Sequence, residues 1–175
     1  MATCDECGFD WTSAPADTIA EIARINSNFT TLGRDATRSS TVDTDRMLRT
    51  RPPSGGWPSC EYLAHVRDVL DFYTDRLELV LTTHRPPMTA TDFATLADQA
   101  RYNDEDINIV LLTISERASA ASRRLAWLVP SEWGRVGIGS SGGERSVLDL
   151  ARRLAHEGRH HHVDVQRVLR EIYLR

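Results

Sequence analysis

Two pairs of residues near the C-terminus have the spacing of metal ligands on one face of a helix. His156 and His160 are four residues apart, and so are Glu157 and His161. Because each helical residue turns the chain by ~100°, side chains four apart point in nearly the same direction and can bind one ion. Imidazole and carboxylate groups are ligands of divalent metals such as zinc. The spacing therefore predicts metal chemistry in this segment, with two candidate pairs.

The apolar pattern of the segment favours the second pair. On a helical wheel that starts at the first apolar residue of the segment, apolar side chains such as Leu154 cluster between ~300° and ~20°. Glu157 and His161 fall near ~280° and ~320°, at the edge of this stripe. His156 and His160 fall near ~180° and ~220°, among charged residues. We therefore expect the Glu157 pair to face the protein interior and the His156 pair to face water.

A third candidate ligand, His65, lies on a different predicted helix. It is one turn from Tyr62 and from Val69, on the flank of that helix's apolar face. Two imidazoles and one carboxylate form a divalent-metal set that leaves positions open for water or substrate. We predict that His65 joins Glu157 and His161 in binding such a metal. The alternative is that the histidines are hydrogen-bonded core residues and that the glutamate pairs with an arginine.

Four long segments with helical periodicity position these residues, and they predict an all-α four-helix bundle. The connections after the first and second helices are long, so the topology need not be a simple up-down-up-down arrangement. A short pair of strands is expected around residues 133–138. The four helices are expected at residues 15–33, 58–84, 104–128 and 146–173, with short helices at 43–49 and 92–99.

Composition limits the class of protein. A chain of 175 residues with 41% hydrophobic and 26% charged residues is typical of one soluble domain. The apolar runs are too short to cross a bilayer, and the N-terminus lacks the pattern of a signal peptide, so a cytoplasmic location without a membrane partner is expected. All 21 basic residues are arginine and the net charge is −4, which argues against a nucleic-acid partner.

The cysteines indicate a separate N-terminal head, residues 1–14, in front of a bundle domain at residues 15–175. Cys4 and Cys7, followed by glycine, resemble one half of a zinc ribbon whose second half is missing. A site completed by a partner chain, a redox pair and a reduced structural head all remain open. Cys60, in the first turn of the second helix, is expected to be buried.

Two motifs resemble a known family. Residues 56–65, Gly-Trp-Pro-Ser-Cys-Glu-Tyr-Leu-Ala-His, resemble the helix-two signature of the DinB-like superfamily. Glu157 and His161, followed by His-Val-Asp at 162–164, are similar to the helix-four signature of its mycothiol-dependent branch. That branch includes maleylpyruvate isomerase and mycothiol S-transferases. The resemblance covers about residues 15–175.

The resemblance implies a four-helix bundle with a divalent metal, usually zinc, held by one residue of helix two and two of helix four. Carried over by position, the ligands are His65, Glu157 and His161. Other branches use a His-x-x-x-His pair, which His156 and His160 also supply. The choice between this pair and Glu157 with His161 therefore stays open. Asp164, one turn after His161, is expected to orient a ligand from behind.

The implied activity is thiol chemistry. A metal with three protein ligands keeps a low-molecular-weight thiol, of the mycothiol type, as thiolate, and this thiolate attacks an electrophilic substrate. The result is S-transfer, or isomerisation by reversible addition. Two alternatives remain: a hydrolase that uses hydroxide on the same metal, and a non-enzymatic metal-stabilised stress or ligand-binding protein. A homodimer is a further expectation from the family.

Overall fold

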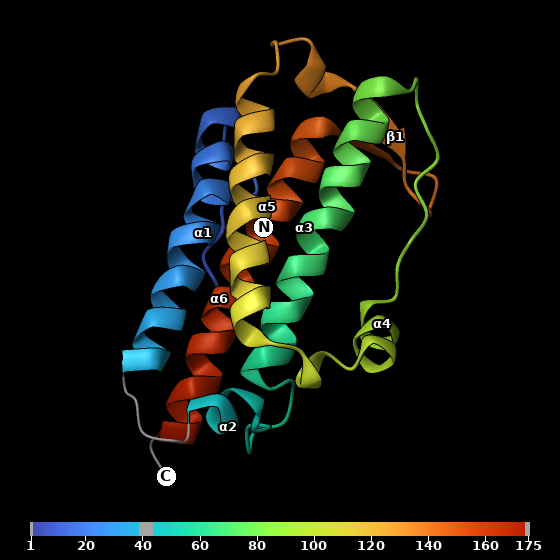
Figure 1. Ribbon diagram of the computed structural model, residues 1–175. Helices are drawn as coiled ribbons and strands as arrows, with labels where there is room; N and C mark the ends of the chain where they lie inside the picture. Colours follow the sequence, from blue (N-terminus) through green and yellow to red (C-terminus); the bar gives the residue numbers. More distant parts are fainter. Residues whose placement is uncertain (1, 39–43, 174–175) are drawn as a thin grey trace.

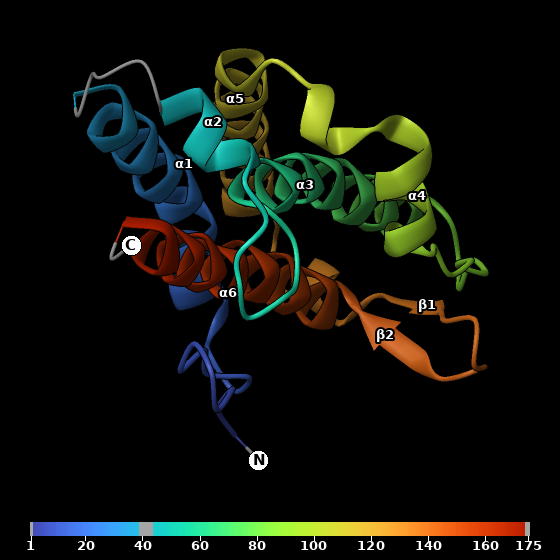
Figure 2. The same cartoon turned by 90° about the horizontal axis from the view of Figure 1, so that it is seen from below.

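Four long helices form the body of the protein in the computed structural model, which describes residues 2–38 and 44–173. Around the bundle the order is α1, α5, α3, α6, so that α6 packs against both α1 and α3 (Figures 1 and 2). The predicted four-helix bundle is confirmed. The helices are α1 (Pro15–Arg38), α3 (Ser59–Thr82), α5 (Ile107–Ala126) and α6 (Val147–Tyr173).

The direction of the helices explains the long connections. In Figure 1, α1 and α6 run downward, whereas α3 and α5 both run upward. Neighbouring parallel helices need a connection that returns along the bundle. The segment between α3 and α5 makes this return and contains α4 (Phe93–Ala100) and the 3₁₀ turn η1 (Tyr102–Asp104). The connection after α1 contains α2 (Thr44–Arg49), and its first part, residues 39–43, lies outside the described residues.

Aspartate side chains cap the starts of α4 and α5. The carboxylate of Asp106 accepts hydrogen bonds from the backbone N–H groups of Asn108 and Ile109, which caps α5. Asp92 caps α4 in the same way. The predicted stop of the first helix at Gly33 is wrong, because α1 continues to Arg38. A glycine ends a helix when it adopts a left-handed backbone, and the backbone of Gly33 is helical.

A small hairpin precedes α6. Strand β1 (Val136–Ile138) pairs antiparallel with β2 (Glu144–Ser146), after the 3₁₀ turn η2 (Glu132–Gly134). The expectation of a strand pair around 133–138 is confirmed for the first strand and wrong for the second, which lies at 144–146. That strand is Glu-Arg-Ser, which has no apolar alternation to indicate it. The connection after α3 also joins this hairpin, because the N–H of Met88 donates to the carbonyl of Ile138 at 2.7 Å.

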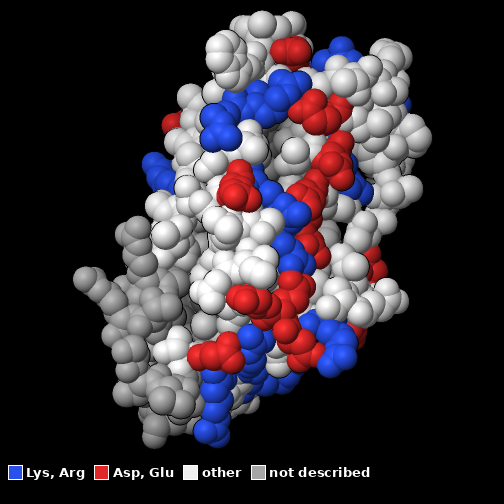
Figure 3. Space-filling view, in the orientation of Figure 1, with Lys and Arg blue, Asp and Glu red and all other residues white. Residues whose placement is uncertain are grey.

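Ion pairs line the seam between the parallel helices α3 and α5. Arg117 lies 2.8 Å from Asp71, and Arg124 lies 2.6 Å from Glu78. Figure 3 shows basic and acidic side chains gathered side by side on this face. Because these side chains are part-exposed, each pair contributes at most about 1 kcal/mol. The apolar core therefore supplies most of the stability of the helix packing.

The N-terminal residues fold back onto α6. Thr3 and Asp10 form an isolated antiparallel bridge, so this segment is a tight hairpin. The Nε of Arg159 donates to the carbonyl of Cys7 at 2.7 Å, and the Nε of Arg152 donates to the carbonyl of Ser13 at 2.9 Å. Figure 2 shows this segment on the side of α1 and α6 that faces away from α5. Among the described helices, none is long and apolar enough to cross a membrane.

Candidate metal centre

Three residues from two helices meet inside the bundle. His65 comes from α3, and Glu157 and His161 come from α6. The Oε2 atom of Glu157 lies 3.2 Å from Nε2 of His161 and 3.6 Å from Nε2 of His65. One ligand atom from each residue lies within 4.8 Å of the other two. The structure therefore brings together the three residues that the sequence predicts.

The cluster is closely packed on both sides. Gly158, next to Glu157, lies where α1 crosses α6, and a Cβ there would meet Cδ1 of Ile25 at 2.3 Å. Only a glycine permits this close approach of the two helices. On the other side, the buried His65 ring packs edge-on against Phe93, 4.9 Å between centroids, and against Trp57, 5.3 Å. These aromatic walls fix the imidazole in place.

A buried carboxylate lies behind His161. Nδ1 of His161 lies at 2.8 Å from Oδ2 of Asp164, as a hydrogen-bond donor to that carboxylate. The guanidinium of Arg167 donates to the other oxygen of Asp164 at 2.6 Å. With its proton on Nδ1, the ring presents Nε2 to Glu157 and the cluster. Asp164 thus has the geometry of the orienting residue that the sequence predicts.

The electrostatics of the cluster suit a cation. Burial raises the pKa of Glu157, but the nearby imidazoles of His156, His161 and His65 outweigh burial and hold this pKa well below its usual range. Burial lowers the pKa of His161, but the carboxylates of Asp164 and Glu157 outweigh it and raise this pKa to about 9. Positive charge is therefore stabilised at the point where the three side chains meet.

Comparison with known proteins agrees with this fold. A sequence model of the DinB superfamily matches residues 31–164. The chain belongs to the DinB superfamily. YfiT from Bacillus subtilis, described as a probable metal-dependent hydrolase with an unusual four-helix bundle topology, matches the structure with a TM-score of 0.77. That match has 16% sequence identity and covers 89% of this chain and 86% of YfiT. A comparison with curated proteins found no match.

The second pair of histidines in this DinB superfamily protein does not face water, which corrects the prediction from the helical wheel. The His156 and His160 side chains are only 15% and 22% exposed. The N-terminal head covers them, and the Trp11 ring lies 4.5 Å from the His156 ring. A helical wheel shows which face a residue occupies, but it does not show that a distant segment folds over that face.

The head also brings two thiols to these histidines. Sγ of Cys4 lies 3.7 Å from Nδ1 of His160. Cys4, Cys7, His156 and His160 each offer one ligand atom within 4.8 Å of the other three. Sequence reasoning missed this cluster, because it treated the cysteine pair and the histidine pair as separate features. Their combined spacing, Cys-x₂-Cys and His-x₃-His, was the available signal.

A cavity of about 390 Å³ reaches the first cluster at Glu157. One wall belongs to α3 and α6, and the other to residues 88–93 and the loop between the two strands. Aromatic and arginine side chains line it together, among them Phe72, Tyr73, Phe93, Arg76, Arg145 and Arg153. Such a cavity is large enough for a small molecule with an apolar part and an anionic group.

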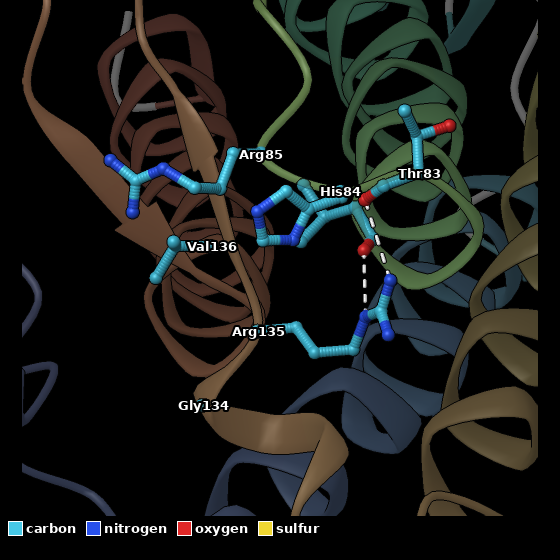
Figure 4. Close-up of a pocket in the computed structure, with 7 residues that line it drawn as sticks. Thr83, His84, Arg85, Gly134, Arg135 and Val136 are labelled. Carbon is cyan, nitrogen blue, oxygen red and sulfur yellow. Dashed lines mark hydrogen bonds between the residues drawn. The ribbon is translucent and has the colours of Figure 1, made fainter.

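A smaller cavity, about 260 Å³, lies at the end of α3 and is drawn in Figure 4. Arg135 closes it by donating from Nε to the carbonyl of Val80 at 2.9 Å and from Nη2 to that of Thr83 at 3.4 Å. The His84 ring lies beside these bonds, and this residue is exposed (Figure 4). Because the cavity shares no residue with either histidine cluster, we assign the chemistry to the larger cavity.

Proposed function

We propose that His65, Glu157 and His161 bind a divalent metal ion, and that the protein is a metal-dependent enzyme acting on a small anionic molecule. The observation that carries the proposal is the convergence of these three side chains beside the larger cavity. Two imidazoles and one carboxylate leave coordination positions open for an exogenous molecule. Zinc suits this ligand set.

The distances support a metal at this point. Two ligand atoms that are each about 2.1 Å from a tetrahedral ion lie about 3.4 Å apart. The separations of Glu157 Oε2 from His161 Nε2 and from His65 Nε2, 3.2 and 3.6 Å, bracket this value. Nδ1 of His65 is buried without a hydrogen-bond partner among the described residues, and its Nε2 is too far from Glu157 for a good hydrogen bond. The Nε2 atom of His65 is therefore available to bind a cation beside Glu157.

The cavity supports an anionic substrate. Arg76, Arg145 and Arg153 line it, and guanidinium groups bind carboxylates and other oxyanions. Burial, together with the nearby carboxylate of Glu157, raises the pKa of Tyr73. Its phenol therefore stays protonated and can donate a hydrogen bond to a group bound beside Glu157. The aromatic rings of the cavity then exclude water from the apolar part of the substrate.

The reaction that we propose is transfer or isomerisation that uses a low-molecular-weight thiol of the mycothiol type. The bound metal would lower the pKa of a thiol and so supply a nucleophile near neutral pH. The chain's own residues would orient this thiol, bind its polar groups through Arg153, and hold the electrophile against Tyr73. The positions of Glu157 and His161 resemble the helix-four signature of the mycothiol-dependent branch, and this resemblance supports a thiol as the co-substrate.

Hydrolysis is the second candidate. The match to YfiT, described as a probable metal-dependent hydrolase, favours it. The same three ligands and the same cavity would serve both reactions, because a water molecule and a thiol can occupy the same open position. The two candidates differ in whether a thiol is consumed.

Metal analysis and a thiol-dependence assay test the proposal. His65→Ala, Glu157→Ala and His161→Ala should each lose one equivalent of metal relative to the unmodified protein. Arg153→Ala should keep the metal but raise KM for an anionic electrophile, whereas Arg123→Ala, at an exposed position, serves as the matched control. Turnover that requires added thiol supports S-transfer, and turnover without thiol supports hydrolysis. If the three ligand variants keep a full complement of metal, the proposal is wrong.

A further inference from the structure

We propose that Cys4, Cys7, His156 and His160 bind a second metal ion, a zinc that clamps the N-terminal head onto α6. These residues are distinct from the three of the candidate metal centre. Two thiolates and two imidazoles form a complete tetrahedral set, as in structural zinc sites. A full set of protein ligands leaves no open position, so this second site is structural and takes no substrate.

The ligand atoms lie close to the separation that zinc requires. A sulfur about 2.3 Å and a nitrogen about 2.0 Å from a tetrahedral ion lie about 3.5 Å apart. Sγ of Cys4 and Nδ1 of His160 are 3.7 Å apart. All four ligand atoms lie within 4.8 Å of one another, so small side-chain movements bring them onto one ion.

The backbone of the head is folded as a turn around the two sulfurs. The N–H of Gly8 donates to the carbonyl of Cys4 at 2.8 Å, and the N–H of Cys4 donates to the carbonyl of Phe9 at 2.8 Å. Gly8 has φ +67°, a left-handed conformation that glycine adopts without strain. The Cys-x-x-Cys-Gly sequence therefore has a physical reason: the glycine reverses the chain so that both thiols point to the same side.

The surroundings favour a thiolate at Cys4 and hold the head in place, whereas burial raises the pKa of Cys7 to about 11, so zinc would displace the proton of that thiol. The cysteines are free thiols. Hydrogen bonds, first from the backbone N–H of Cys7 and then from His156, lower the pKa of Cys4 to about 6. Arg159 ties the head to α6 by donating to the carbonyl of Cys7. A head of a dozen residues has little core of its own, and small units of this kind depend on metals or disulfides.

The two sites lie back to back on α6. His156 and Glu157 are sequence neighbours, with Nδ1 of the first 3.8 Å from Oε1 of the second. Oδ2 of Asp164 lies 2.8 Å from Nδ1 of His161 and 3.7 Å from Nε2 of His160. One buried carboxylate thus stands behind a histidine of each site. The His-Glu-x-x-His-His pattern at residues 156–161 therefore supplies both clusters. His156 and His160 belong to the second site, and Glu157 and His161 belong to the first.

The decisive experiment is metal counting combined with cobalt substitution in the full-length protein. Reduced protein loaded with zinc should bind two equivalents, and Cys4→Ser/Cys7→Ser should bind one. After substitution with cobalt, the unmodified protein should show sulfur-to-cobalt charge-transfer absorption in the near ultraviolet. His65→Ala/His161→Ala should keep this absorption, because its remaining site contains the sulfurs. Failure of the proposed function would lower the counts of the unmodified protein and of the double serine variant by one each and would leave the cobalt absorption of the His65→Ala/His161→Ala variant in place, so the two proposals are tested separately.

Two controls keep the result interpretable. Cys60→Ser should keep both equivalents and the cobalt absorption, since its thiol donates to the side chain of Asn103 and is not part of the cluster. Should the double serine variant fail to fold, mass-spectrometric mapping of alkylation in the unmodified protein replaces it, and zinc should protect Cys4 and Cys7. The inference is wrong if the reduced protein shows no sulfur-to-cobalt absorption, if the double serine variant keeps it, or if zinc leaves both thiols open to alkylation.

Discussion

Replacing Gly158 by alanine should destabilise the protein, although alanine is the better helix former. A Cβ at this position would lie 2.3 Å from Cδ1 and 2.4 Å from Cγ1 of Ile25, compared with about 3.5–4.0 Å for a normal carbon contact. Ile25 is 1% exposed, so it cannot move into solvent. Overpacking of this kind costs roughly 1–3 kcal/mol, and the upper end applies because two atoms overlap by more than 1 Å.

The helix propensity of alanine offsets part of this cost, by about 1 kcal/mol. The net expectation for Gly158→Ala is a loss of about 2 kcal/mol in the free energy of unfolding, or about 4–8 °C in Tm for a chain of this length. Chemical denaturation followed by circular dichroism measures it. Gly134→Ala is the control, because nothing lies within 4 Å of a Cβ there, and its effect should stay within about 0.5 kcal/mol.

A double-mutant cycle separates the steric overlap from other effects. Ile25→Ala alone should cost about 2–5 kcal/mol through the cavity that it leaves. In the Gly158→Ala background it should cost at least about 1 kcal/mol less, because the new methyl group occupies part of that cavity. If Gly158→Ala is as stable as the unmodified protein, or if the two changes are additive, the close approach of α1 to α6 is not what the structure describes.

Three further predictions concern ionisable groups. Asp164→Asn should weaken zinc binding by the candidate metal centre about 10–100-fold, as measured by calorimetry, because His161 loses its carboxylate partner. Unchanged affinity would contradict the orienting role of Asp164. Because the pKa of His161 is raised to about 9 in the metal-free protein, zinc must displace a proton below that pH. The affinity of the candidate metal centre for zinc should therefore rise about tenfold per pH unit below pH 9. A chelator competition that gives a pH-independent binding constant would refute this. Burial raises the pKa of Cys60 to about 12, so iodoacetamide should leave this thiol unmodified at pH 8 until denaturant unfolds the chain, and rapid labelling of the folded protein would show the burial to be wrong.

The local pattern of the chain determined the helices and the first ligand cluster. Apolar periodicity located all four long helices, and carboxylate caps such as Asp92 and Asp106 marked where helices begin. The four-residue spacing of Glu157 and His161 depends only on helical geometry, so the sequence could predict their common face. The meeting with His65 needed one more assumption, that the second and fourth long helices are neighbours, and the bundle satisfies it.

Tertiary structure alone decided which surfaces are covered. His156 and His160 lie on the polar face of α6, and nothing in their local sequence indicates that Trp11 and the cysteine turn pack over them. Likewise, the strand at 144–146 exists because its partner lies beside it, and its own residues carry no strand pattern. The physical reason is the same in both cases: periodicity reports a side chain's position on its own element, whereas burial and metal geometry depend on contacts between segments that are distant along the chain.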